Sequence, residues 1–272
     1  MMNIKDLPNF WTRKQRNLLR LFIPCGGNMI RFYRSCLMVL CFTIFGIGAG
    51  IISFIIFPYI SLTIKKENRK KAYANTIRSS WNGFKNFFQK IGLVKVCCKN
   101  PEKLENLSGK VIVANHPTLI DVIILISLIP NSVCIAKKET LKNPLFRNIV
   151  QSIYITNDTD LETYKTEADK FLKKGFNIVI FPSGTRTKPD ENFKIHNGSA
   201  VIAINSNTEI IPVKITTDYP FLQKHQPIYD IGEHQVNFYI DVKNPINPAN
   251  FQDISEIKMR KHINNKIKEE II

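Results

Sequence analysis

The chain has 272 residues, of which 44% are hydrophobic, so it is long enough for one sizeable core and too apolar for a disordered protein. The net charge of +16 is concentrated in residues 1–100, where 17 Lys and Arg face two acidic residues, Asp6 and Glu67. Such a basic segment suits either nucleic acid or an anionic membrane surface. The six cysteines are spaced neither as a zinc site nor as a disulfide framework, which indicates free thiols.

Residues 1–34 are predicted to form a basic amphipathic segment. At helical spacing its aromatic and aliphatic side chains share one face and its basic side chains lie on or near the other, which suits the headgroup boundary of a membrane. The apolar set is Phe10, Trp11, Leu18, Leu21 and Phe22, and the basic set is Arg13, Lys14, Arg16 and Arg20.

Residues 35–64 contain no charged side chain, and about 20 apolar residues suffice to span a bilayer. We expect a membrane helix or a re-entrant hairpin of two short helices, because three glycines interrupt the run and Pro58 follows them. Basic residues on both flanks favour the hairpin, and a buried core helix is the alternative. An apolar span between these flanks, without a recognised nucleic-acid motif, argues against a nucleic-acid partner.

Residues 65–100 are predicted to form a basic interfacial connector. An aromatic stripe at helical spacing lies beside Lys85 and Lys90, and it suits either the membrane interface or packing against the rest of the protein. The stripe consists of Trp81, Phe84, Phe87, Phe88 and Ile91.

From residue 101 to residue 272, short apolar strands alternate with helical patterns, which is typical of an α/β domain with a mostly parallel central sheet flanked by helices. The predicted strands cover residues 110–114, 133–136, 153–156, 177–181, 209–215 and 235–242. The predicted helices cover residues 119–128, 161–174, 199–205 and 253–272. Active sites in such sheets gather beyond the carboxyl ends of the strands.

The first chemical motif spans residues 115–121 and directly follows the first predicted strand. Pro117 disfavours a helical conformation at His116 and suits the start of a helix, so Asp121 is expected in the first helical turn behind the histidine. Its carboxylate can hold one imidazole nitrogen and leave the other as a general base. The H-x-x-x-x-D spacing alone is weak, because residues 225–230 repeat it in a polar loop.

The second motif spans residues 181–187, reads Phe-Pro-Ser-Gly-Thr-Arg-Thr and follows the fourth predicted strand. Gly184 allows a ligand to approach the backbone closely, Thr185 offers a hydroxyl, and Arg186 offers guanidinium donors that suit a phosphate. The alternative is an ordinary turn with a solvated Arg186. Ser183 is a candidate hydrolase nucleophile, although no Gly-x-Ser-x-Gly elbow surrounds it.

Together the two motifs resemble those of the lysophospholipid acyltransferase family, the PlsC-like 1-acyl-sn-glycerol-3-phosphate acyltransferases. The family's N-H-x-x-x-x-D motif is matched by residues 115–121, and its F-P-E-G-T-R-S motif by residues 181–187, with Ser183 in place of the usual Glu. The altered second motif looks more like the bacterial subgroup associated with aryl-polyene-type lipids. The resemblance implies His116 and Asp121 as catalytic residues and Asn115, Ser183, Gly184, Thr185 and Arg186 as substrate-binding residues.

The resemblance implies a membrane-bound O-acyltransferase of phospholipid biosynthesis. It would move a fatty acyl group from an acyl carrier protein or coenzyme A thioester to a lipid hydroxyl, such as that of a lysophospholipid, with no metal or other cofactor. The expected place is the anionic surface of a bacterial inner membrane, with the acyltransferase domain, residues 101–272, on the cytoplasmic face. The alternatives are a non-catalytic membrane-binding protein with a degenerate site, and a lipid or thioester hydrolase.

Overall fold

The central feature of the fold is a seven-stranded sheet in the order β1-β7-β6-β2-β5-β3-β4. The computed structural model describes residues 28–136, 144–156, 160–188, 191, 195–251 and 253–272. The strands are β1 (Val94–Lys99), β2 (Val111–Ala114), β3 (Ser132–Ala136), β4 (Tyr154–Thr156), β5 (Asn177–Ile180), β6 (Ile210–Thr217) and β7 (Val236–Val242). Among these described strands, β6 and β7 pair antiparallel and the other neighbours pair in parallel. The predicted α/β class with a mostly parallel sheet is therefore confirmed.

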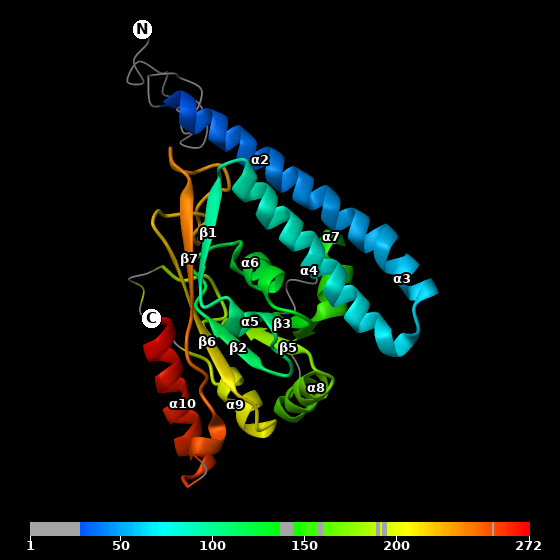
Figure 1. The fold of residues 1–272 in the computed structure, drawn as a ribbon, viewed down its shortest axis with the longest axis vertical. Coiled ribbons are helices and arrows are strands. Elements are labelled where there is room, and N and C mark those ends of the chain that lie inside the picture. The colour runs from blue at the N-terminus through cyan, green and yellow to red at the C-terminus, as the bar shows by residue number, and fades with distance from the viewer. Residues whose placement is uncertain (1–27, 137–143, 157–159, 189–190, 192–194, 252) are drawn as a thin grey trace, which may run out of the picture.

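Helices cover both faces of the sheet (Figure 1). One face carries α4 (Lys66–Lys90), α6 (Asp121–Leu128) and α7 (Pro144–Ile153), and the other carries α8 (Leu161–Lys173), α9 (Gly198–Asn205) and α10 (Glu256–Ile271). Two short turns, α5 (Glu102–Glu105) and the 3-10 helix η4 (Pro248–Phe251), join strands to their neighbours. This cover on both sides explains why β2 and β5 are buried along their whole length.

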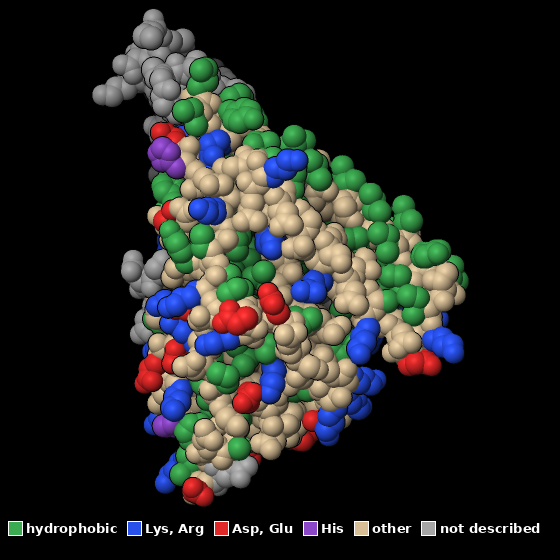
Figure 2. Space-filling model, viewed as in Figure 1, with side chains coloured by type: hydrophobic (Ala, Val, Ile, Leu, Met, Phe, Trp, Pro, Cys, Tyr) green, Lys and Arg blue, Asp and Glu red, His purple; other side chains and the backbone are tan. Residues whose placement is uncertain are grey.

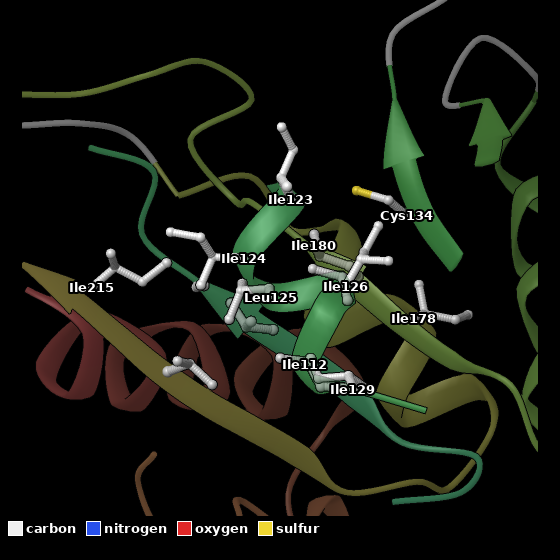
Figure 3. Packing of buried hydrophobic residues seen from close by; sticks show 14 of the residues in the cluster. Ile112, Ile123, Ile124, Leu125, Ile126, Ile129, Cys134, Ile178, Ile180 and Ile215 are labelled. Carbon is white, nitrogen blue, oxygen red and sulfur yellow. The ribbon is translucent and has the colours of Figure 1, made fainter. Parts of the chain in front are cut away.

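A buried part of the hydrophobic core lies where α6 packs on the sheet. Figure 3 shows Ile124 and Ile126 of this helix beside strand residues such as Ile112 and Ile178. Helix α6 is apolar on all sides because α4 covers the side that faces away from the sheet. The first turn of α6 is thereby fixed in place, and that turn begins with Asp121.

The apolar run near the N-terminus forms one continuous helix. Its parts are α2 (Asn28–Ile51), the π-helical turn η2 (Ile52–Ile56) and α3 (Phe57–Thr63). The predicted re-entrant hairpin within residues 35–64 is therefore wrong, and the single apolar helix is confirmed. The glycines cost too little helix stability to break a helix that packs against the protein along one side.

The π-helical turn has a local cause in Pro58, which follows it at the start of α3. Proline has no N–H for the regular helical ladder and crowds the carbonyl four residues before it, so the helix widens there instead of breaking. The carbonyl of Ser53 in this turn accepts a hydrogen bond of 3.1 Å from the side-chain amide of Asn148 on α7. The wide turn is therefore also a point of attachment to the domain.

Within the aromatic stripe of residues 81–91, Trp81 and Phe88 are buried and the other side chains are half-buried, so the stripe packs against the rest of the protein. Its role at a membrane interface stays a prediction. Phe45 of α2 lies against Phe84 with ring centroids 4.6 Å apart, and Phe42 meets Phe88 edge-on at 6.2 Å. These contacts hold α4 against α2 as a pair of adjacent helices (Figure 1). The predicted stripe from Phe10 to Phe22 lies outside the described residues.

The sheet begins before the predicted domain boundary at residue 101. Strand β1 lies at the sheet edge and pairs in parallel with β7, with Val94 opposite Val236. Its sequence, Val-Lys-Val-Cys-Cys-Lys, loses the apolar/polar alternation at the adjacent cysteines, so the run is too short to predict a strand. The connector of residues 65–100 therefore contains α4 together with the first strand of the domain.

Asn177 is a buried polar residue that ties two loops, the one before β2 and the one before β3, to the start of β5. Its side-chain nitrogen donates to the carbonyls of Leu107 and Pro130, each at 2.8 Å. Its side-chain oxygen accepts from the backbone N–H of Lys110 at 3.0 Å. One fully buried amide thus satisfies three backbone groups close to the two central strands.

Replacement of Asn177 by Ala is expected to lower the free energy of unfolding by about 2–4 kcal/mol, since it leaves three backbone groups without their partner. Urea unfolding followed by circular dichroism measures the change. The control is Asn75→Ala on the exposed side of α4, which is expected to shift stability by less than about 0.5 kcal/mol. Equal unfolding midpoints for the two variants would contradict the role given to Asn177.

Candidate active site

The parallel pairing of β2 with β5 brings the two sequence motifs together. Val113 lies opposite Ile180, so the two strands end at the same edge of the sheet. The chain leaves β2 toward α6 on one face and leaves β5 toward α9 on the other, an arrangement that opens a crevice at the strand ends. The motifs occupy this edge, where the backbone N–H of Thr187 donates to the carbonyl of His116 at 2.9 Å.

His116 and Asp121 form the hydrogen-bonded pair that their spacing predicts. The distance from His116 Nδ1 to Asp121 Oδ2 is 2.8 Å, and the Asp121 side chain is fully buried while 18% of the His116 side chain stays exposed. Since Nδ1 faces the carboxylate, Nε2 is the nitrogen left for a substrate proton. The Phe181 ring stacks on the imidazole with centroids 4.4 Å apart, which fixes the plane of the ring.

Thr118 is a site residue that the sequence reasoning missed. Its backbone N–H donates to Asp121 Oδ2 at 2.7 Å, and its hydroxyl donates to Oδ1 at 2.5 Å. With His116, the carboxylate therefore has three partners, which orient both of its oxygens. The signal was present in the sequence, because Thr118-x-x-Asp121 before an apolar helix is a capping-box pattern in which the acidic side chain bonds back to the first residue.

The second motif forms a tight turn after β5. Gly184 adopts a φ of +63°, which favours glycine, and its N–H donates to the Phe181 carbonyl at 2.9 Å. The Ser183 hydroxyl is buried and donates to the Thr185 carbonyl at 2.7 Å. Gly184 and Thr185 are exposed at the tip of the turn, while the Ser183 hydroxyl is engaged within it.

Arg186 connects the second motif to the segment between β6 and β7. Its Nη1 donates to the carbonyls of Leu222 and Gln223 at 3.0 and 3.1 Å. The Leu222 carbonyl also accepts the N–H of Leu119, at 3.0 Å, so both motifs meet at one carbonyl. The other guanidinium nitrogens of Arg186 make no hydrogen bond to a described residue and remain available to a ligand.

Asn115 bonds to the sheet. Its side-chain nitrogen donates to the Ile215 carbonyl at 2.7 Å, and its side-chain oxygen accepts from the Ile215 N–H at 2.6 Å. The side chain thus continues the pairing of β2 with β6 beyond the last strand residue and positions the backbone that enters His116. Its contact with substrate stays a prediction.

The segment of residues 218–235 also binds the N-terminal helix. The Nε of Arg34 donates to the Gly232 carbonyl at 2.9 Å, and the Ser35 hydroxyl donates to the Tyr229 carbonyl at 2.6 Å. This segment therefore joins α2 at one end to Arg186 and the first motif at the other.

The second copy of the H-x-x-x-x-D spacing forms no such site. His225 is exposed at a φ of +67°, and within the described structure its ring makes no hydrogen bond to Asp230. Spacing alone does not make the pair, because the polar loop gives neither residue a buried partner.

A cavity of about 420 Å³ lies at the end of β5. Phe181, whose ring stacks on His116, and Gly184 both line it, and the other walls come from β3, α8 and α9. This edge of the sheet thus brings together the hydrogen-bonded His116–Asp121 pair, the Arg186 guanidinium, whose other nitrogens have no partner among the described residues, and an adjoining space for a ligand.

The profile of the Acyltransferase family matches residues 95–216, which contain both motifs. The chain is 31% identical to the 1-acyl-sn-glycerol-3-phosphate acyltransferase of Helicobacter pylori, over 61% of this chain and 68% of that enzyme. It is 33% identical to the enzyme of the same name from Cocos nucifera, over 38% of this chain and 36% of that enzyme. Across the curated relatives, the matching segments span from 36% to 68% of the relatives' own lengths.

The fold matches a solved structure as well. The 1-acyl-sn-glycerophosphate acyltransferase PlsC from Thermotoga maritima superposes with a TM-score of 0.67 at 22% identity, over 88% of this chain and 95% of that one. At this identity the match shows a shared fold. From the family profile, the sequence relatives and the two motifs together, we conclude that the chain belongs to the family of PlsC-like 1-acyl-sn-glycerol-3-phosphate acyltransferases.

Proposed function

We propose that this chain is an O-acyltransferase that moves a fatty acyl group from a thioester to a lipid hydroxyl, with His116 as the general base. The observation that carries the proposal is the buried Asp121 carboxylate held on His116 Nδ1 at 2.8 Å, which leaves Nε2 as the ring nitrogen that can accept a substrate proton. The names of the sequence relatives support a glycerolipid acceptor.

The proposed reaction needs no covalent enzyme intermediate. Nε2 of His116 removes the proton from the acceptor hydroxyl as its oxygen attacks the thioester carbonyl carbon. The imidazolium that forms is stabilised by Asp121, whose two oxygens are held by Thr118. When the carbon–sulfur bond breaks, the thiolate takes the proton from His116, so an ester and a free thiol leave the site.

The acceptor is proposed to be a lysophospholipid or a similar lipid. Arg186 supports a phosphate-bearing acceptor, because its Nη1 is anchored by two carbonyls while its other nitrogens have no described partner. The turn that directly precedes Arg186 consists of Ser183, Gly184 and Thr185. The donor is a thioester of coenzyme A or of acyl carrier protein, and membership of the aryl-polyene-associated subgroup stays a prediction.

The hydrolase alternative is not favoured by the geometry of Ser183. Its hydroxyl donates to the Thr185 carbonyl within the turn, and no imidazole among the described residues bonds to it. A degenerate, non-catalytic site is not favoured either, since His116, Asp121 and Thr118 form a complete hydrogen-bonded set.

We further propose that α2, η2 and α3 lie along a membrane surface. Met29–Thr63 is long and apolar enough to cross a membrane, yet one side packs on α4 and α7 along its length. The other side exposes a stripe of large hydrophobic side chains, which Figure 2 shows along the edge of the molecule. A helix of this length, roughly 50 Å, that is attached to a charged domain throughout suits the plane of the interface better than a crossing.

The cations at the end of this stripe suit anionic lipid headgroups. A cavity of about 530 Å³ lies between the start of α4 and the end of α8, and four lysines and two glutamates line it. The lysines are Lys66, Lys70, Lys170 and Lys174. The Lys70 ammonium lies 4.2 Å from the centre of the Phe171 ring, and burial lowers its pKa from the ordinary value. Lysines next to an apolar surface are typical of contact with an anionic membrane.

His116→Asn is expected to lower the rate of acyl transfer by about 10²–10⁴, because an amide keeps the shape of the site and cannot act as a base. The measurement is turnover of labelled palmitoyl-coenzyme A with a lysophosphatidate acceptor in detergent. The matched control is His225→Asn, which changes the second copy of the spacing and suits a positive φ. Near-normal turnover in the His116 variant, with intact folding, would contradict the assigned base.

Thr118→Val is expected to lower turnover by about tenfold with little change in KM, because it removes one of the hydrogen bonds that orient Asp121. Thr118→Ser keeps the hydroxyl and is expected to restore most of the rate. Steady-state kinetics on the two variants tests this, and equal loss in both would contradict it, because keeping the hydroxyl would then not preserve the rate.

Ile47→Gln and Phe54→Gln are each expected to weaken binding to phosphatidylglycerol vesicles by about 10–100-fold, since each removes an exposed apolar side chain from the stripe. Vesicle sedimentation gives the partition coefficient. Ile257→Gln on α10, also an exposed isoleucine, is the control and is expected to leave binding unchanged. Unchanged binding of the stripe variants would refute the proposed membrane face.

A further inference from the structure

The cavity of about 530 Å³ lies at the edge of the sheet opposite to His116. Its walls come from the start of α4 and the end of α8, and Phe176, the residue before β5, is part of its lining. Strand β5 begins beside this cavity and ends at the second motif, so the length of the strand separates the cavity from the candidate active site. In Figure 2, Lys and Arg side chains lie around this corner, below the apolar edge formed by α2 and α3.

The lining of this cavity carries more positive than negative charge. Helix α4 contributes two lysines one turn apart, the end of α8 contributes two more, and each helix adds one glutamate. These residues are Lys66, Lys70, Lys170, Lys174, Glu67 and Glu167. Ion pairs between described residues include none of the four ammonium groups. Four lysines against two glutamates leave an excess of two positive charges, which a bound anion would balance.

Helix stability accounts for only one of the two lysine pairs. Lysines at the end of α8 complement the negative end of its helix dipole. Lys66 is the first residue of α4, where the positive end of the dipole disfavours a cation, and Lys70 follows one turn later. Like charges one turn apart also repel each other. The lysines of α4 are therefore better explained by a ligand than by the stability of their helix.

Lys70 is held at the cavity by an aromatic ring. Its ammonium lies 4.2 Å from the centre of the Phe171 ring, an attractive contact that restricts the end of a flexible side chain. Burial lowers the pKa of Lys70, Glu167 acts against this shift, and Lys174 adds to it. A partly dehydrated ammonium attracts an anion more strongly than a fully hydrated one, because the surrounding medium screens the charge less.

The position of the cavity suits a lipid headgroup. Ammonium groups from two helices can surround a phosphate as point charges, and the volume is within the range of ligand pockets. The apolar stripe of α3 ends just before Lys66, at Leu62, whose side chain is 86% exposed. In the proposed orientation of α2 and α3 on a membrane, the cavity therefore lies at the level of the headgroups.

We propose that this cavity is a non-catalytic site for the phosphomonoester headgroup of a membrane lipid. A phosphomonoester carries a charge of about −1.5 to −2 at neutral pH, which matches the excess in the lining better than the charge of about −1 on a phosphodiester. The inference rests on the proposed function, since it assumes the membrane placement of α2 and α3. A lysophosphatidate acceptor and its acylated product both belong to this lipid class, so the site would hold the protein where its own acceptor and product gather.

Lysine labelling locates the bound lipid. The probes are phosphatidylcholine vesicles that contain phosphatidate, and vesicles brought to the same surface charge with phosphatidylglycerol. Acetic anhydride modifies accessible lysines, and mass spectrometry measures the rate at each one. We expect phosphatidate to slow the modification of Lys70 and Lys174 by about fivefold relative to phosphatidylglycerol. Lys71 and Lys173, exposed neighbours outside the lining, are expected to react equally with both vesicles, and equal protection of all four lysines would overturn the site.

Two pairs of variants measure the contribution of the cavity to binding. Lys70→Gln and Lys174→Gln are each expected to weaken binding to phosphatidate vesicles by about fivefold, and to bring the ratio of affinities for phosphatidate and phosphatidylglycerol vesicles toward one. Lys71→Gln and Lys173→Gln remove the same charge outside the lining and are expected to keep the wild-type ratio. Control variants that lose the ratio as fully as the cavity variants would overturn the proposal.

A soluble lipid separates failure of this inference from failure of the proposed function. Dihexanoyl phosphatidate reaches the cavity without a membrane, and labelling without an acyl donor does not depend on acyl transfer. We expect this lipid to protect Lys70 and Lys174 more than glycerol 3-phosphate at the same concentration, because Phe171 and Phe176 offer apolar surface to its chains. Equal protection by glycerol 3-phosphate would overturn the lipid as the source of the phosphate. No protection by either compound would overturn the site and leave acyl transfer standing.

Discussion

The parallel pairing of β2 with β5 is the constraint on which the site depends. Backbone pairing of these two buried strands brings His116 near Phe181, which lies 65 positions later in the chain. A shift of one residue in this register would turn the side chains of one strand to the opposite face of the sheet. Asp121 depends on the same constraint, because α6 packs beside these strands and fixes the turn in which the carboxylate lies.

Local features were predictable from the sequence and non-local ones were not. Pro117 and the apolar strand before it were enough to predict the turn at His116. The same motif contains the capping-box spacing of Thr118 and Asp121, from which the hydrogen bond between them could also have been predicted. The hairpin expected within residues 35–64 followed from local glycine content, whereas packing against α4 and a π-helical turn before Pro58 keep the helix continuous. The partners of Arg186 come from a distant loop and could not be inferred from spacing.

The segment of residues 218–235 shows how a polar loop becomes part of a site without contributing a catalytic side chain. Its backbone carbonyls accept hydrogen bonds from Arg34 and Ser35 of α2, from Arg186 and from Leu119. Each donor belongs to an element that the proposed function needs in a fixed place. The segment thereby fixes the distance between the helix proposed to lie on the membrane and the histidine proposed to act on the lipid.

The surroundings of His116 have a stereochemical consequence. Asp121 occupies one ring nitrogen, Phe181 covers one face of the ring, and only 18% of the side chain is exposed. A hydroxyl can therefore reach Nε2 from a narrow range of directions. A glycerol backbone is chiral once it carries different substituents, so its two mirror-image forms would present their hydroxyls to this nitrogen with different fits. In the proposed reaction, the stacked ring would therefore act with the other walls of the chiral site to favour one enantiomer of the acceptor, although it takes no part in the chemistry.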